Sequence, residues 1–478
     1  MLITLAAPAF AGTWYIENGD ITVKASGTEG KNTVSQGANQ EVEDTDTIIT
    51  NQNQNKASSN TVTIDANGKN DKVEVTLKDV NIDTSSRNKA AVSVTGSGNT
   101  TIKLDGDNAL KSDIYRSGIY GSGSLTISGG ENDSLTAQGG SGANGISSSG
   151  SLTISGGTVT ANGGNGGYGI YSSGVTISGG TITANGGSGK DGSGDGIFSF
   201  DPVAISGGTV TAKGGSGEDG EDGGDGIRSF DPVAISGGTV TAKGGSGEDG
   251  SGGRGIISTK SVTISGGTVN ANGGSGKNGN GGNGIIGSGR VAISGGTVNA
   301  AGGDGGNGKD GGDGIRSGGI DLSGSLELTA KAGSPNGKAL SRAGSELELD
   351  TIKDKLGPGA KVTVTDANGE TKQVSIPRPV EPEKPVIPEE SSSSSDGGSS
   401  APSAPASSLP GLTVTDKSGA VISYTSTQSG NTLTVCVGRL TASFRISLAA
   451  LRQLRAEGIE TITFQTILCS TTLSVDEL

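Results

Sequence analysis

The stretch SFDPVAISGGTVTAKGGSGEDG occupies residues 199–220 and recurs letter for letter at residues 229–250. Two further patterns carry this repeat along the chain: an isoleucine that follows glycine, and the isoleucine of ISGG. The first lies at positions 119, 146, 170, 197, 227, 256, 285 and 315, and the second at positions 127, 154, 177, 205, 235, 264 and 293. A low-complexity linker has no reason to keep apolar residues in phase. The region is therefore predicted to be a folded repeat array with units of roughly 23–30 residues.

Each unit has the pattern of three short strands separated by glycine corners. The segments GIFSF, PVAISG and GTVTAKG alternate apolar and polar residues between positions 196 and 214, which is the period of a strand. Val203, Ile205 and Val210 are predicted to point inward and the threonines outward, while Gly-Gly pairs make corners with positive φ. No segment between corners is long enough for a helix.

The small size of one unit decides how the units are arranged. About five inward aliphatic side chains contribute on the order of 8–10 kcal/mol of apolar burial. Ordering the residues of one unit costs roughly 1–2 kcal/mol each, so a single unit cannot fold alone. Stacked units can, because each strand then pairs with the strands above and below it at about 4.8 Å. The sequence predicts an all-β fold, a parallel β-helix of about ten to twelve coils over residues 61–376.

Composition divides the rest of the chain. Residues 1–11 hold a short apolar run that ends in Ala9-Phe10-Ala11, which is typical of the remnant of a signal peptide, although a buried first strand has the same pattern. Residues 12–60 are predicted to cap the first coil. Residues 377–410 contain eight of the 13 prolines of the chain and the run SSSSS, as expected for a linker.

Residues 411–478 are predicted to form a small α+β module. A helix is expected to begin after the N-cap Ser447, to bury Leu448, Leu451 and Leu454, and to end at Gly458. The expected strands are Leu412–Thr415, Val421–Thr425, Thr432–Val437 and Ile459–Thr466.

The overall composition excludes several classes of function. A net charge of −14 argues against nucleic acid and anionic membrane surfaces as partners. The absence of histidine excludes Ser-His-Asp and Cys-His catalysis and most histidine metal sites. No run of 18 apolar residues occurs, so no transmembrane segment is expected. The chain is expected to be a monomer, and its two cysteines, Cys436 and Cys469, either pair or remain buried thiols.

The glycine corners carry acidic residues that suggest a calcium site. GGSGKD at 186–191 and GGSGED at 214–219 and 244–249 resemble the start of a calcium-binding nonapeptide, and stacking would align their carboxylates on one edge. Oxygen ligands in corners suit Ca²⁺. A solvated acidic edge has the same pattern. The candidate calcium ligands are Asp191, Glu218, Asp219, Asp222, Asp225, Glu248 and Asp249, with Glu221 beside them.

The residue after each Gly-Ile pair forms a column that is predicted to point outward, because the preceding isoleucine points inward. Aromatic residues and arginines are concentrated in it, although the chain is only 3% aromatic. Such a strip is suited to stacking sugar rings, with arginine meeting carboxylates. Alternatively, Phe200 and Phe230, each followed by Asp-Pro, plug a corner. The candidate carbohydrate-binding residues are Tyr120, Tyr171, Phe198, Phe200, Arg228, Phe230 and Arg316.

Several stretches are similar to the secreted carbohydrate-binding-domain β-helix proteins of anaerobic Gram-positive gut bacteria. They are TWYIENGDITV at 13–23, VTLKDVNIDTS at 75–85, the repeated ISGGTVTANGG, and LRQLRAEGIETITFQT at 451–466. The resemblance implies a right-handed β-helix related in shape to pectate lyases, mostly non-catalytic, with acidic plant sugars among its ligands. Relatives carry GIGGG where this chain has GIFSF or GIRSF, and no catalytic residue carries over.

The expected function is therefore non-catalytic polysaccharide binding, adhesin-like, in a secreted or cell-surface protein. The alternatives are a calcium-assisted polysaccharide lyase with an arginine or lysine such as Arg228 as base, and a structural stalk. Near-identical coils give a uniform surface rather than one cleft lined by distinct residues. That uniformity favours binding over catalysis.

Overall fold

A computed structural model describes residues 11–378 except 27, 29 and 191, and then 412–415, 422, 424–437, 442–466 and 470–475. The chain forms two compact units, residues 1–382 and residues 383–478. No helix in these described ranges is both long and apolar enough to cross a membrane.

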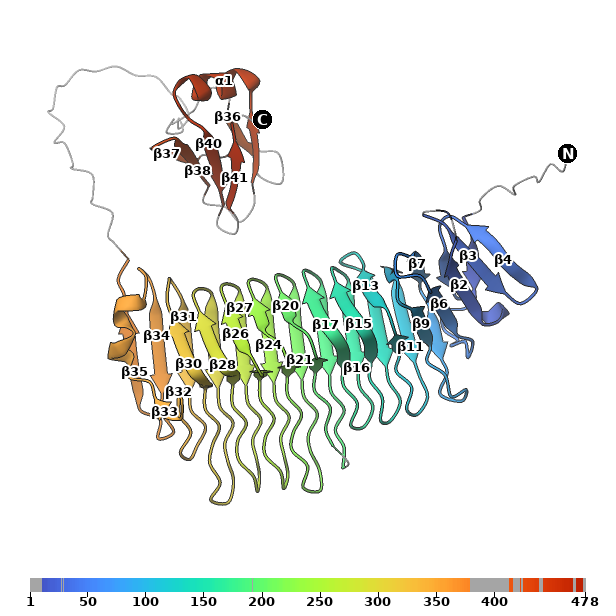
Figure 1. Cartoon of the computed structure of the whole chain (residues 1–478), viewed down its shortest axis with the longest axis horizontal. Helices are drawn as coiled ribbons and strands as arrows, with labels where there is room; N and C mark the ends of the chain where they lie inside the picture. The colour runs from blue at the N-terminus through green and yellow to red at the C-terminus, as the bar shows by residue number, and fades with distance from the viewer. Residues whose placement is uncertain are drawn as a thin grey trace, which may run out of the picture. The chain divides into compact units, whose positions relative to one another are not determined.

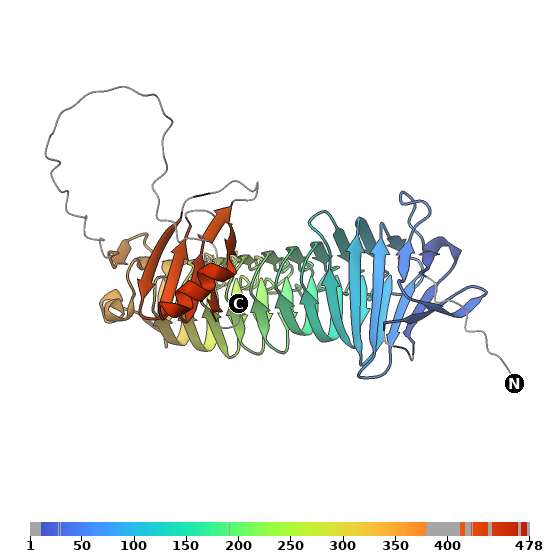
Figure 2. The ribbon, with the colours of Figure 1, turned by 90° about the horizontal axis from the view of Figure 1, so that it is seen from above.

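The first unit is the predicted parallel β-helix, or β-solenoid, with its coils stacked side by side in a single row (Figures 1 and 2). In the described part of the unit, the first and second strands of the coils join into one sheet of 23 strands, and the third strands form a sheet of 12. Neighbouring coils pair in parallel, for example Ile197 with Ile227 and Val210 with Val240.

The strands of the larger sheet that belong to the coils and to the C-terminal end are β6 (Val62–Ala66), β7 (Lys72–Lys78), β9 (Val92–Gly96), β10 (Asn99–Asp105), β12 (Ile119–Gly121), β13 (Ser124–Ser128), β15 (Ile146–Ile154), β17 (Ile170–Ile177), β19 (Ile197–Ser199), β20 (Val203–Ile205), β22 (Ile227–Ser229), β23 (Val233–Ile235), β25 (Ile256–Ser258), β26 (Ser261–Ile264), β28 (Ile285–Ile293), β30 (Ile315–Leu322), β32 (Leu340–Arg342) and β33 (Ser345–Glu346). Those of the smaller sheet are β8 (Asn81–Asp83), β11 (Asp107–Lys111), β14 (Ser134–Gln138), β16 (Thr158–Asn162), β18 (Thr181–Asn185), β21 (Thr209–Lys213), β24 (Thr239–Lys243), β27 (Thr268–Asn272), β29 (Thr297–Ala301), β31 (Glu327–Lys331), β34 (Lys361–Thr365) and β35 (Thr371–Ser375).

The core consists of the apolar columns that the sequence predicts. The isoleucine after glycine is fully buried in each of the eight coils that carry it, and so are the valines and isoleucines of the second strand. Val210, Ala212 and their equivalents are the buried residues of the third strand. The predicted strands GIFSF, PVAISG and GTVTAKG correspond to β19, β20 and β21.

The ends of the β-helix are closed by antiparallel strands. At the N-terminal end lie β1 (Thr13–Tyr15), the 3-10 turn η1 (Ile16–Asn18), β2 (Ile21–Ala25), β3 (Asn32–Gln36), β4 (Asn39–Asp44) and β5 (Ile48–Thr50). β2, β3 and β4 pair antiparallel, while β1 and β5 already continue the parallel sheet. At the other end, two 3-10 turns, η2 (Leu349–Thr351) and η3 (Lys353–Lys355), precede β34, and β35 pairs antiparallel with it.

The long corners between third and first strands are packed by backbone alone. Gly215 N donates to Gly194 O, Gly224 N to Gly215 O, and Gly245 N to Gly224 O, each at 2.8–2.9 Å. The hydrogen bonds alternate between the two arms of one corner, the segment that leaves the third strand and the segment that enters the next first strand, and the corner of the next coil. We call the whole series the glycine ladder, which comprises Gly187, Gly194, Gly215, Gly224, Gly245, Gly253, Gly274, Gly282, Gly303, Gly312 and Gly333. A Cβ atom on Gly245 would lie only 1.8 Å from Gly215 O, so the arms pack closer than any side chain allows.

The second unit contains the predicted helix, α1 (Leu448–Ala456), in which Ser447 Oγ accepts a hydrogen bond from Ala450 N. Gly458 follows with a φ of 82°, as expected for a helix stop. Its strands are β36 (Leu412–Thr415), β37 (Thr425–Ser429), β38 (Thr432–Cys436), β39 (Ser443–Ile446), β40 (Thr461–Gln465) and β41 (Ser470–Ser474). Of the two cysteines, Cys436 is a free thiol, and Cys469 lies outside the described residues.

Candidate functional site

The first strand of each coil presents one residue outward, as the sequence predicts. Tyr120 pairs with Ser147, Ser147 with Tyr171, and Tyr171 with Phe198 in neighbouring coils. We call this series the outward column, which continues from Phe198 through Arg228, Ile257, Ile286 and Arg316 to Ser341. Parallel pairing places like positions directly above one another, so a surface property repeats from coil to coil.

Five of the 13 aromatic residues of the chain gather in the middle of this column. The rings of Tyr171 and Phe198 stack with their centroids 5.3 Å apart because the two residues face each other across neighbouring strands. The aromatic cluster consists of Tyr168, Tyr171, Phe198, Phe200 and Phe230.

The prediction that these side chains form one exposed strip is wrong for Phe198, which is only 6% exposed. Its side chain leaves the core as expected, but Tyr171 stacks on one side, and Phe200 and Phe230 meet its ring edge-on. Phe200 and Phe230 are themselves 42% and 38% exposed, so their rings remain open to a ligand. Phe198 supports the cluster and the two outer rings form its surface.

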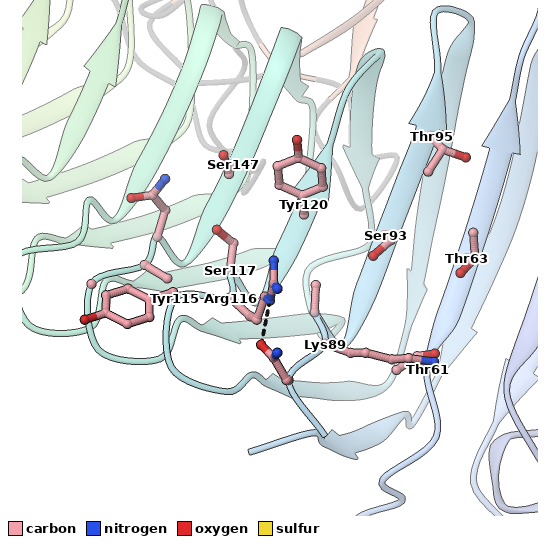
Figure 3. A pocket seen from close by; sticks show the side chains of 15 residues that line it. Thr61, Thr63, Lys89, Ser93, Thr95, Tyr115, Arg116, Ser117, Tyr120 and Ser147 are labelled. Carbon is pink, nitrogen blue, oxygen red and sulfur yellow. Dashed lines mark hydrogen bonds between the residues drawn. The ribbon is translucent and has the colours of Figure 1, made fainter. Parts of the chain in front are cut away.

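A groove of about 570 Å³ lies on the same face toward the N-terminal end (Figure 3). Outward residues of four successive first strands line it: Thr63 of β6, Ser93 of β9, Tyr120 of β12 and Ser147 of β15. Tyr120 is 48% exposed within it. The groove crosses several coils, so it is suited to an extended ligand.

The side of this groove is built by corner residues that sequence reasoning missed. Tyr115 is 76% exposed and has a φ of 59°, a left-handed backbone that aromatic residues rarely adopt. Its ring packs against Gly142, whose φ of 75° favours glycine. Arg116 Nε donates to Asn88 Oδ1 at 3.1 Å, and Lys89 pairs with Asp20 at 3.1 Å. The irregular early coils give no periodic pattern from which these positions could be inferred.

A second groove, of about 340 Å³, follows the aromatic cluster toward the C-terminal end. The predicted Arg316 lies here, exposed, with Arg254 and Lys338 from other coils. Asn283 and Asp313 complete the polar lining. The outward column therefore carries a cluster of aromatic rings between two polar grooves.

Beside the outward column runs a second column, which we call the capping column because its side chains accept backbone N–H groups from the next coil. Asn144 Oδ1 accepts from Tyr168 N at 3.0 Å, and Asp195 Oδ1 from Asp225 N at 2.6 Å. Asn283 and Asp313 bond in the same way to the coils that follow them. Both amide and carboxylate oxygens can therefore accept a backbone N–H group of the next coil.

Asp225, which the sequence placed on the calcium edge, belongs instead to the capping column. Its side chain is 2% exposed and lies 3.7 Å from Arg228 Nη1 and 3.6 Å from Arg254 Nη1. The expectation that Asp225 is an edge ligand is therefore wrong. Glycine at positions 223, 224 and 226 folds this end of the corner back against the next coil, which sequence spacing alone does not indicate.

The electrostatics of this buried pair are unusual. Burial, and next the neighbouring Asp225 carboxylate, raise the pKa of Asp195 to about 7. Burial raises the pKa of Asp225 as well, against the pull of Arg254 and Arg228. Asp195 Oδ2 and Asp225 Oδ2 have no hydrogen-bond partner within the described residues.

The remaining edge carboxylates line up across coils as predicted, because Gly217 bridges to Gly189 and to Gly247. Lysines neutralise part of the row: Lys190 lies 3.1 Å from Asp219, and Lys277 lies 2.6 Å from Glu248. The other exposed carboxylates are Glu218, Glu221, Asp222 and Asp249. Asp191 lies outside the described residues. Among the residues described, no three His, Cys, Asp or Glu side chains gather closely enough to hold a metal ion, so this set does not fit a calcium site by itself.

Calcium binding at this edge stays a prediction that a melting experiment decides. An ion bound only to the folded chain stabilises it by mass action. Millimolar calcium should then raise the melting temperature of the full chain, and excess EDTA should lower it. Equal melting temperatures in calcium and in EDTA would leave the ion pairs with Lys190 and Lys277 as the role of these carboxylates.

Comparison with known families supports the repeat assignment. A family model described as Beta helix repeat matches five successive stretches, residues 152–170, 175–197, 203–227, 233–256 and 262–285. No curated protein and no solved structure matches the chain. The matched stretches run through the coils that carry the aromatic cluster, so the candidate site is built on β-helix repeats.

Proposed function

We propose that the chain is a non-catalytic polysaccharide-binding protein, secreted or at the cell surface, whose ligand lies along the outward column. The observation that carries the proposal is the aromatic cluster, whose half-exposed outer rings Phe200 and Phe230 lie on one face with two polar grooves. Sugar rings present apolar C–H faces that stack on aromatic side chains, while their hydroxyl groups need polar partners. A regular polymer that follows the coils repeats such contacts, and weak contacts add through avidity.

The arrangement gives little support to lyase chemistry at Arg228. A base must be able to lose its proton, whereas a guanidinium stays protonated in proteins, and that of Arg228 lies 3.7 Å from the Asp225 carboxylate. The acids nearest to it, Asp195 and Asp225, are buried and out of reach of a polymer. Incubation with polygalacturonate tests this alternative, since a lyase releases unsaturated products that absorb ultraviolet light.

The binding proposal is tested by removing the outer rings alone. In a panel of plant and microbial polysaccharides, the Phe200→Ala/Phe230→Ala variant should bind the preferred polymer at least about tenfold more weakly, since each lost stack is worth about 1 kcal/mol. Tyr120→Ala should weaken binding through the N-terminal groove. Phe198 is left in place because its burial makes it part of the packing.

Tyr15→Ala is the matched control, because Tyr15 is also exposed, at 37%, but lies outside the outward column. Its affinity should equal that of the parent. Full affinity in the double phenylalanine variant would place the ligand elsewhere. Absence of binding to every polymer would leave the structural stalk as the better account.

A further inference from the structure

Arg228 occupies a distinctive position at the edge of the aromatic cluster. Its Cζ atom lies 5.9 Å from the ring centre of Phe198 and 5.7 Å from that of Phe230. Its side chain is 39% exposed, so the guanidinium covers the rings and still reaches solvent. Arginine has five N–H donors in a rigid plane, more than one carboxylate uses. Donors are therefore available beside Phe230, one of the two exposed rings on which a sugar would stack.

The carboxylate of Asp225 lies on the buried side of this guanidinium and is itself fixed by the next coil. Its Oδ1 atom accepts a hydrogen bond from Arg254 N at 2.7 Å, whereas its Oδ2 atom is the one 3.7 Å from Arg228 Nη1. The N–H group of Asp225 donates to Asp195 Oδ1. A continuous series of contacts thus runs from the capping column to the rings.

Backbone capping alone does not explain the charge at position 225. Asn283 occupies the same column and accepts the N–H group of Asp313 with an amide oxygen. Asp313 accepts a hydrogen bond from Lys338 N at 2.8 Å, but it forms no ion pair with Arg316 in the described structure. In sequence, Asp313 precedes Arg316 by the same number of residues as Asp225 precedes Arg228. A buried charge is costly unless it is paired. The contact that distinguishes Asp225 is its pairing with Arg228 and Arg254.

We propose that Asp225 is a positioning residue of the ligand-binding surface, whose carboxylate holds the Arg228 guanidinium over Phe198 and Phe230 so that its outer N–H groups can donate to a sugar oxygen. The ligand part rests on the proposed function, whereas the positioning does not. Fixing the guanidinium in advance removes the cost of ordering a long side chain when the ligand binds.

The charged and titratable groups that face this carboxylate are Asp195, Arg228 and Arg254, with Tyr168 two coils before it. Asp195 lies one coil away and carries a proton below neutral pH, since its pKa is about 7. Loss of that proton adds a second negative charge under Arg228. The Arg228 signal should therefore move with this titration.

The first test observes Arg228 in the full chain without ligand. In a sample labelled with ¹⁵N-arginine, the Nε–H signal of Arg228 is assigned by its loss in Arg228→Lys. In the parent, the aromatic rings should displace the chemical shift of this signal, and the shift should change with pH between 6 and 8. Asp225→Asn, which keeps an oxygen for Arg254 N, should remove the displacement, and Asp195→Asn should remove only the pH response.

Asp313→Asn is the matched control, since Asp313 occupies the same column and lacks the arginine pair. It should leave the Arg228 signal unchanged. An Arg228 signal that is the same in Asp225→Asn as in the parent, or that changes equally in Asp313→Asn, would overturn the proposal. Arg228→Gln is a second variant for the test, because it removes the guanidinium while Asp225 stays in place.

The second test measures binding of polygalacturonate and of its carboxyl-reduced polymer. Asp225→Asn should bind the preferred polymer about fivefold more weakly, as expected for the loss of about 1 kcal/mol, although it retains all the rings. Asp313→Asn should bind like the parent. If neither polymer binds even the parent, the proposed function fails for these sugars, and the Arg228 signal still decides whether Asp225 positions the arginine. Unchanged binding in Asp225→Asn beside an altered signal would overturn the ligand part alone.

Discussion

Gly245→Ala is expected to destabilise the β-helix by about 3 kcal/mol or more, the upper range for overpacking a well-packed site. The added Cβ atom would lie 1.8 Å from Gly215 O and 2.5 Å from the carbonyl carbon of Gly215, both backbone atoms that cannot rotate away. Relief requires the two coils to separate. Separation stretches the hydrogen bond from Gly245 N to Gly224 O, which is 2.8 Å long.

Gly319→Ala is the control for the general cost of adding a methyl group. A Cβ on Gly319 would meet only Gly289 O, at 3.8 Å, which is an ordinary contact. Its backbone does not adopt a left-handed φ, so alanine fits and lowers the entropy of the unfolded chain. Denaturant unfolding, followed by circular dichroism, should give a large loss for Gly245→Ala and none for Gly319→Ala. Equal midpoints for both variants would show that the corners tolerate side chains.

The glycine ladder also marks how far the sequence could predict the fold. The period predicted the coils, the inward isoleucines and the three strands, because these features depend on nearest neighbours in sequence and on stacking. Positive φ was predicted for the Gly-Gly pairs in general. It is found at the second glycine of ISGG, where Gly208 and Gly238 both have a φ of 76°, but not at Gly214 or Gly215. The ladder glycines serve another purpose. They are required because the corner arms of different coils approach each other closely. This contact can be recognised only once the coils are stacked in the structure.

The candidate site was predictable to the same extent. The outward column follows from alternation, so Tyr120, Tyr171 and Arg316 were found. Alternation gives the direction of a side chain but not what covers it, which is why the burial of Phe198 was missed. Tyr115 lies on an irregular corner of an early coil, where neither period nor spacing applies.

Asp195→Asn is expected to stabilise the protein at pH 8 and to flatten its stability between pH 5.5 and 8. The folded chain binds the Asp195 proton more tightly than the unfolded chain does, since burial and Asp225 raise the pKa from 3.8 to about 7. A raised carboxyl pKa contributes stability that is complete below the unfolded value and is lost as pH rises through the folded value. The difference corresponds to about 4 kcal/mol at most, lost mainly between pH 4 and 7.

An asparagine at position 195 reproduces the neutral state at every pH. Its amide oxygen can accept the N–H group of Asp225, as Asn144 Oδ1 accepts that of Tyr168 at 3.0 Å in the same column. Denaturant unfolding of parent and variant at pH 5.5 and pH 8 measures the effect. The chain has no histidine, so few other groups titrate in this window.

The test uses the difference in unfolding free energy between parent and variant at each pH, rather than the pH dependence of the parent alone. Burial also raises the pKa of Glu346, which adds a pH dependence of the same sign to both. The carboxyls whose pKa is lowered by hydrogen bonds, such as Asp20, change charge at lower pH and fall outside the window. A variant with the parent's pH dependence would mean that folding does not raise the pKa of Asp195. A variant less stable than the parent at pH 8 would mean that the charge of Asp195 stabilises the fold.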